Sequence, residues 1–133
     1  MNANQKILNI LVSEDNPEYV KQYTEELNGL PVAFNIVDND NSLLEKFKED
    51  IYDLVVVTYH PSGLNGIDAI KEMRKLTRNS DLPEVPMYLI STEGVRTAAL
   101  NAGASYFLTK PLSRGTLKEI VNRYLDAQVC LRK

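Results

Sequence analysis

The stretch Tyr52-Asp53-Leu54-Val55-Val56-Val57 decides the fold class of this chain. Consecutive apolar and β-branched residues over this length are typical of a parallel strand that is buried on both faces of its sheet. We expect the strand to cover Asp53–Val57 and to end at Thr58. Because reacting groups gather at the carboxyl ends of strands in open α/β sheets, Thr58 stands where functional chemistry is expected.

Similar apolar runs recur on both sides of this strand, and helical patterns separate them. Asn16 or Asp15 can cap a helix that has Pro17 at its first position, a favoured place for proline, and Gly29 ends that helix. The predicted strands are Ile7–Ser13, Val32–Val37, Asp53–Val57, Pro86–Ser91 and Tyr106–Thr109. Alternating strands and helices with short links predict an α/β fold, a doubly wound parallel sheet with helices on both faces.

The helices of this pattern are placed by apolar residues at helical spacing. Leu76 is expected on the buried face of the third helix, and Thr77–Glu84 is expected to form a polar loop. The predicted helices are Pro17 to about Asn28, Asn41 or Ser42 through Lys48, a helix after Gly66 marked by Ile67, Ile70, Met73 and Leu76, a short helix Val95–Asn101 before Gly103, and a last helix marked by Leu117, Ile120, Val121, Tyr124 and Leu125.

The composition is that of a soluble globular domain. The chain has 133 residues, of which 44% are hydrophobic and 25% charged, so we expect a single domain over residues 1–133 with no output domain. A net charge of −3 argues against nucleic acid as a direct partner, since phosphate binding needs clustered Lys and Arg. The lone Cys130 excludes a disulfide within the chain, and no apolar run is long enough to span a membrane. A cytoplasmic protein is therefore expected.

Polar residues follow four of the predicted strands. Each has an ordinary structural explanation when taken alone, such as a helix cap, a turn residue or a solvated charge. Because the carboxyl ends of parallel strands meet at one edge of the sheet, we expect these groups to converge there. They are Glu14 and Asp15 after the first strand, Thr58 after the third, Ser91 and Thr92 at the fourth, and Lys110 after the fifth.

With these residues the sequence resembles, over nearly its whole length, the receiver domain of bacterial two-component response regulators. The resemblance implies a flavodoxin-like (βα)5 fold with strand order 2-1-3-4-5. It also implies roles for individual residues. Glu14 and Asp15, with the backbone carbonyl of His60, would hold Mg²⁺, Ser91 and Lys110 would bind phosphoryl oxygens, Phe107 would be the aromatic that changes rotamer on activation, and Gly66 matches a family glycine.

The main departure from the family is Thr58, which stands where receivers have the phosphate-accepting aspartate. A threonine hydroxyl is a weak nucleophile unless an adjacent base takes its proton, and Glu14 and Asp15 are both candidates for that base. One oxygen ligand for a hard cation is also lost, so we expect Mg²⁺ to bind weakly at best. The His60 side chain is expected to be an exposed loop histidine.

The leading hypothesis is therefore a pseudo-receiver with no turnover of its own. It would act through contact with proteins such as a histidine kinase, another receiver or a downstream effector. The expected contact face combines the helix Val95–Asn101, the strand Tyr106–Thr109 and the last helix, and the same face could form a homodimer.

Two alternatives remain open. One is a phosphorylatable receiver with a substitute acceptor, for which the candidates are Thr58, Asp15, Ser91 and Thr92. The other is a flavin or small-molecule binding protein. The acidic loop after the first strand disfavours it, because phosphate groups are bound by glycine-rich loops there.

Overall fold

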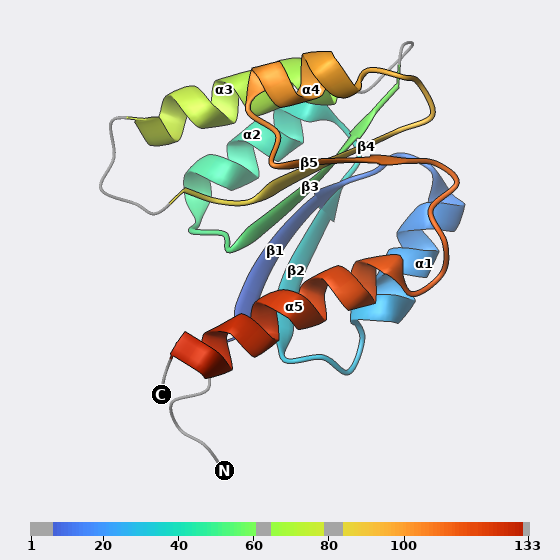
Figure 1. Ribbon diagram of the computed structural model, residues 1–133, viewed down its shortest axis with the longest axis vertical. Coiled ribbons are helices and arrows are strands. Elements are labelled where there is room, and N and C mark those ends of the chain that lie inside the picture. Colours follow the sequence, from blue (N-terminus) through green and yellow to red (C-terminus); the bar gives the residue numbers. More distant parts are fainter. Residues whose placement is uncertain (1–6, 61–64, 79–83, 132–133) are drawn as a thin grey trace.

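The computed structural model describes residues 7–60, 65–78 and 84–131, with side chains described as far as residue 127. Within these ranges strands and helices alternate from the first element to the last (Figure 1). The strands are β1 (Leu8–Ser13), β2 (Val32–Val37), β3 (Leu54–Tyr59), β4 (Met87–Ser91) and β5 (Tyr106–Thr109). The helices are α1 (Pro17–Leu27), α2 (Asp40–Glu49), α3 (Gly66–Arg78), α4 (Arg96–Ala102) and α5 (Thr116–Leu131).

The strands form one parallel sheet in the order β2-β1-β3-β4-β5, so the predicted doubly wound α/β fold and its strand order are confirmed. The apolar run that decided the fold class forms β3, in which every residue except the last is buried. The register pairs Ser13 with Val57 and Tyr59 with Ser91. The carboxyl ends of β1, β3 and β4 therefore lie next to one another.

The helices cover both faces of the sheet. Helices α2, α3 and α4 lie on one face, and α1 and α5 lie on the other (Figure 1). Side chains alternate along β3 between these two layers, as strand geometry requires. Val55 and Val57 pack in the core beneath α2, α3 and α4, whereas Leu54 and Val56 pack in the core beneath α1 and α5. The continuous apolar run of β3 is explained by this double coverage.

The predicted start of the first helix is confirmed in detail. Asn16 is the N-cap residue, and its side chain accepts a hydrogen bond from the Glu18 backbone N–H at 2.9 Å. Pro17 occupies the first turn, and α1 ends at Leu27. The nearby Gly29 has a φ of 87°, which favours glycine at this position.

Several predicted boundaries were wrong. Strand β3 runs on through Thr58 to Tyr59, because ladder pairing with β4 continues past the apolar run. Strand β1 begins at Leu8, since Ile7 is 58% exposed. Helix α2 begins at Asp40 rather than at Asn41 or Ser42, because Asn39 caps it by accepting from the Ser42 N–H at 2.7 Å. It ends at Glu49, one residue later than predicted.

Smaller corrections apply further along the chain. Strand β4 begins at Met87 rather than Pro86, and α4 covers Arg96–Ala102, one residue later than predicted. Leu76 is 44% exposed and does not belong to the buried face of α3. Helix α3 extends to Arg78, so the predicted polar loop begins later than expected, and residues 79–83 of that loop lie outside the described residues. Among the described helices, none has the length and apolar character needed to cross a membrane.

Candidate functional site

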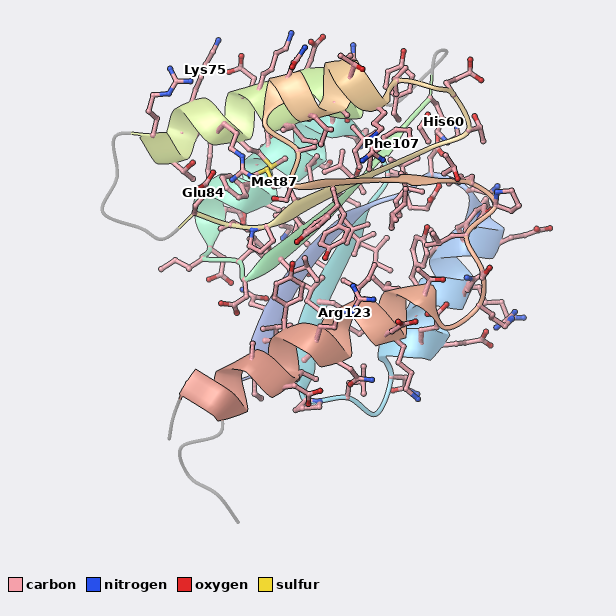
Figure 2. All side chains as sticks on the ribbon, in the orientation of Figure 1. His60, Lys75, Glu84, Met87, Phe107 and Arg123 are labelled. Carbon is pink, nitrogen blue, oxygen red and sulfur yellow. The ribbon has the colours of Figure 1, made fainter. Side chains whose placement is uncertain are left out.

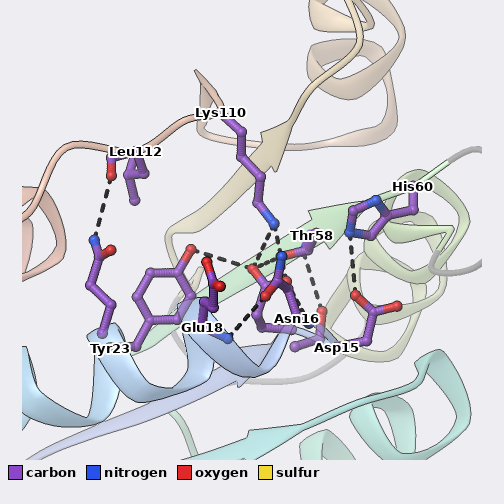
Figure 3. A network of polar contacts seen from close by, with 11 residues as sticks. Asp15, Asn16, Glu18, Tyr23, Thr58, His60, Lys110 and Leu112 are labelled. Atoms are coloured by element: carbon purple, nitrogen blue, oxygen red, sulfur yellow. Dashed lines mark hydrogen bonds and ion pairs between the residues drawn. The ribbon is translucent and has the colours of Figure 1, made fainter.

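A buried ion pair lies at the carboxyl edge of the sheet (Figure 3). Lys110, which follows β5, places its Nζ 2.9 Å from Oε1 and 3.0 Å from Oε2 of Glu14, which follows β1. The Lys110 side chain is 4% exposed and that of Glu14 is 0% exposed. The two residues are separated by most of the sequence, and only the parallel sheet brings them together. The two charges neutralise each other out of reach of solvent.

Thr58 belongs to the same network. Its side chain is fully buried, and its Oγ1 donates a hydrogen bond to Glu14 Oε1 at 3.0 Å. Its backbone N–H donates to the Ser13 Oγ at 3.3 Å. Of the two candidate bases, Glu14 and Asp15, Glu14 is therefore the one whose carboxylate contacts the Thr58 hydroxyl. The hydroxyl is held inside the protein and faces the Glu14 carboxylate.

Two tyrosines of α1 complete the network, and sequence reasoning missed them. The Tyr23 hydroxyl donates to Glu14 Oε1 at 3.4 Å, and burial together with the charge of Glu14 raises the pKa of Tyr23. Lys110 Nζ lies 4.1 Å from the centroid of the Tyr19 ring, within range of a cation–π interaction. Their spacing could have identified them, because residues four apart lie on one face of a helix and this helix directly follows the acidic pair.

The Glu14 carboxylate is saturated by these contacts. Its Oε1 contacts the Lys110 ammonium and accepts hydrogen bonds from the hydroxyls of Thr58 and Tyr23. Its Oε2 accepts hydrogen bonds from Lys110 and, at 3.2 Å, from the backbone N–H of Asn16. An ionised carboxylate offers about four lone-pair sites, so no position is left over for a further ligand. Glu14 would have to give up existing partners to bind a metal ion.

Asp15 and His60 lie apart from the buried network, toward the surface. His60 Nε2 is 3.3 Å from Asp15 Oδ1 (Figure 3). The Asp15 side chain is 43% exposed, while that of His60 is 26% exposed. The expectation of an exposed loop histidine was therefore wrong, because the imidazole turns back against Asp15 and is partly covered. The acidic pair is split into one buried and one accessible carboxylate.

Three other residues that the sequence singled out do not join the network around Glu14. Ser91 is fully buried, and its Oγ accepts a hydrogen bond from the Glu93 N–H at 2.8 Å, which commits it to its own loop. Phe107 is half-buried on β5 and packs against the core beneath α2, α3 and α4. Thr92 is exposed. The expected convergence at the sheet edge is confirmed for Glu14, Thr58 and Lys110, which contact one another. Ser91 ends β4 at the same edge, but its hydroxyl is bonded to its own loop.

Gly66 is required by its distance from β3. A Cβ atom added to Gly66 would lie 2.6 Å from Val57 Cγ1 and 2.8 Å from the Thr58 backbone oxygen. Contacts this short do not occur with real Cβ atoms, so a larger residue would push α3 away from the strand that carries Thr58. The glycine lets the helix begin directly beside the site.

The donor set for a metal ion consists of Glu14, Asp15 and His60, each of which offers one ligand atom within 4.8 Å of the others. Mg²⁺ prefers near-octahedral oxygen coordination, whereas imidazole suits transition metals. Because one of the two carboxylates is saturated and the third donor is a nitrogen, the set fits Mg²⁺ poorly. Only Asp15 is both accessible and of the right chemistry.

The comparisons with known proteins place the chain in a family. A sequence model of the response regulator receiver domain family matches residues 10–122. The aerobic respiration control sensor protein ArcB of Escherichia coli K12 is 29% identical over 121 residues, which are 91% of this chain and 16% of that protein. The transcriptional regulatory protein ZraR of Klebsiella oxytoca is 30% identical over 105 residues, 79% of this chain and 23% of that protein.

The solved structures show the same fold. A CheY-like response regulator receiver domain protein from Methanospirillum hungatei JF-1 superimposes with a TM-score of 0.77 at 18% identity, covering 92% of this chain and 97% of the other. The chain spans less than a quarter of the length of either curated relative, 16% of ArcB and 23% of ZraR. The shared part is one domain of those longer proteins.

Proposed function

Because the chain belongs to the response regulator receiver domain family of two-component signalling, we propose that it signals through protein contact and is not phosphorylated at Thr58. Receiver domains interact with histidine kinases and effectors, and they are in general signalling modules without an independent catalytic activity. The proposal for this chain is narrower. It is a pseudo-receiver whose site has become a structural element.

The observation that carries the proposal is the closed network around Glu14. In a receiver, the groups at this edge must be free to meet an incoming phosphoryl group and a metal ion. Here Lys110 is 4% exposed and is paired with Glu14, and Thr58 is fully buried and donates to the same carboxylate. No carboxylate nucleophile stands at the position of Thr58, and the hydroxyl that replaces it is a weak nucleophile that is bonded to Glu14. Each group is already engaged by another part of the protein.

The surface that supports partner contact is the face formed by α4, β5 and α5. A groove of about 470 Å³ runs along it, with Tyr106 and Leu100 among its lining residues. Tyr106 is 53% exposed and stacks on Tyr88 at a centroid distance of 4.7 Å. Figure 2 labels Phe107 on β5 and Arg123 on α5, which also line the groove.

Aromatic side chains surrounded by a polar rim are typical of protein interfaces. We infer that this face receives a histidine kinase, another receiver or a downstream effector. A second copy of the chain on the same face would appear as a dimer in solution.

The proposal is tested by incubating the protein with Mg²⁺ and acetyl phosphate and then measuring its intact mass. A carboxylate oxygen that attacks this donor forms an acyl phosphate and releases acetate. We expect the wild type to stay unmodified and Thr58→Asp to gain one phosphoryl group. Thr58→Val serves as the control, since it keeps the shape of the side chain without any nucleophile.

A wild type that gains the mass overturns the proposal and favours a substitute acceptor. Mapping the modified residue then separates the candidates. Asp15 and Thr92 are the accessible ones, because Thr58 and Ser91 are both fully buried. Modification of Asp15 would be supported by its 43% exposure at the mouth of the site.

A further inference from the structure

The only histidine of the sequence faces a free carboxylate at the sheet edge. The Nε2 atom of His60 is shielded from solvent and has no hydrogen-bond partner in the described part of the chain. It nevertheless lies 3.3 Å from Asp15 Oδ1, a contact without the geometry of a hydrogen bond. This arrangement, a shielded imidazole nitrogen close to a carboxylate oxygen, is the one expected of two ligands that share a metal ion.

The distance between the two atoms suits a metal ion. With bond lengths of about 2.0–2.1 Å to nitrogen and oxygen, two ligands are about 3.4 Å apart in a tetrahedral shell and about 2.9 Å apart in an octahedral one. The 3.3 Å between His60 Nε2 and Asp15 Oδ1 lies close to the tetrahedral value. The side chains would need little movement to accept an ion between them.

We propose that Asp15 and His60 bind a borderline divalent transition-metal ion, with Zn²⁺ as the representative case, where receivers of the family bind Mg²⁺. The imidazole takes the place of the ligand lost at Thr58. Water molecules complete the coordination shell of the ion.

Glu14 contributes only at the edge of this site. Its ligand atom lies within 4.8 Å of those of Asp15 and His60, but Lys110 holds both of its oxygens. Glu14 therefore reaches the ion through a bound water and keeps its ion pair. The charge that attracts the cation comes from Asp15, which no described lysine or arginine neutralises.

Solvent reaches the Asp15 side of the site, because the Asp15 side chain is 43% exposed. Asp15 borders an open pocket of about 640 Å³ between the start of α1 and the start of α2, and Asp38 lines the same pocket. A bound ion would tie the loop after β1 to the loop after β3. Occupation of the site would then depend on metal availability and not on a phosphate donor. This inference concerns a different chemical event from the proposed function, so each can fail separately.

The test is a calorimetric titration of the full chain with Zn²⁺ and, separately, with Mg²⁺. Cys130→Ser is used as the background, because it removes the only thiol of the sequence. We expect Zn²⁺ to bind with one-to-one stoichiometry. His60→Ala should weaken Zn²⁺ binding at least about tenfold, the lower end of what loss of a supporting partner costs a metal site. Mg²⁺ binding should be weak in both proteins and unchanged by the substitution.

Two further variants sharpen the result. Asp15→Asn should also weaken Zn²⁺ binding, whereas Asp38→Asn, in the same pocket but outside the cluster, should leave it unchanged. Co²⁺ gives a direct readout, since the visible absorption of a tetrahedral cobalt site should disappear with His60→Ala. If that variant does not fold, His60→Gln replaces it.

Unchanged Zn²⁺ affinity in the histidine variant, or a loss of affinity in Asp38→Asn as large as in Asp15→Asn, would overturn the proposal. The acetyl phosphate experiment would keep its meaning in either case, because its readout is a covalent mass and its variants are at Thr58.

Discussion

Lys110 and Glu14 form an ion pair in which the ammonium contacts both oxygens of the carboxylate, at 2.9 and 3.0 Å. The pair joins the end of β5 to the end of β1 across the β3 and β4 ends of the sheet edge. In a receiver that binds metal and phosphate, these charges meet changing partners. Here the two charges are paired with each other, so the charges at this edge of the sheet are already neutralised within the protein.

Lys110→Met should destabilise the protein by about 3–5 kcal/mol, because it leaves the buried Glu14 charge without its cation. The side chains have similar length, so packing is largely kept. Urea unfolding monitored by circular dichroism measures the change. A loss below about 1 kcal/mol, the range of exposed pairs, would contradict the buried pairing.

The matched control for that variant is the double substitution Glu14→Gln with Lys110→Met. It removes both charges and retains an amide oxygen that can accept from Thr58 and Tyr23. Removing a whole buried pair is usually far less costly than removing one partner. We therefore expect the double variant to be more stable than Lys110→Met alone. The reverse order would show that packing, and not charge, dominates at this position.

Thr58→Asp should make stability dependent on Mg²⁺. The new carboxylate would lie beside Glu14, since the hydroxyl it replaces is 3.0 Å from Glu14 Oε1. Two buried carboxylates with one lysine repel each other, and a divalent cation relieves that repulsion. Thermal unfolding with and without excess Mg²⁺ should show a rise in melting temperature for this variant alone. Tight Mg²⁺ binding by the wild type would contradict the weakened site.

Gly66→Ala should destabilise the protein by roughly 2 kcal/mol or more. The added Cβ would lie 2.8 Å from the backbone oxygen of Thr58, and because the core is closely packed, α3 would have to shift to make room for it. Gly94→Ala is the control, since a Cβ there meets nothing within 4 Å and the φ of Gly94 is not positive. Chemical unfolding of both variants gives the comparison. Equal stability of the two would show that α3 shifts freely.

Asp40 should give stability a measurable pH dependence. Its Oδ2 accepts from the Asn65 N–H at 2.6 Å, yet burial raises the pKa of Asp40 above 3.8, an effect that this hydrogen bond opposes and the Asp68 charge reinforces. A raised pKa means that the carboxyl supports the fold while protonated, below its ordinary pKa. That support is lost as the pH rises through the folded value.

Asp40→Asn measures this effect, because the amide keeps an oxygen for Asn65 and does not titrate. The free energy of unfolding of the wild type, relative to the variant, should fall as the pH rises from below the ordinary pKa of 3.8 through the raised pKa of folded Asp40. A relative stability that rises over that interval would show that the negative charge of Asp40 favours the fold.

Local patterns predicted the elements of the fold well and their ends less well. The Asn16 and Pro17 cap was read correctly because capping depends on residues that are adjacent in sequence. The end of β3 was placed too early, because Thr58 and Tyr59 are strand residues only through their pairing with β4. The exposure of Leu76 likewise depends on which helices surround α3, and helical spacing alone does not contain that information.

The sequence by itself determined the parallel sheet and the identity of the groups at its edge, because hydrophobic periodicity and strand–helix alternation are properties of the chain. The strand order was predicted only through the resemblance to the receiver family. The tertiary structure alone decided which of these groups meet. It paired Glu14 with Lys110, added Tyr19 and Tyr23, left Ser91 to its own loop and turned His60 toward Asp15. These contacts depend on side-chain directions and on distances of a few ångströms between remote segments, which are fixed only when the two cores pack.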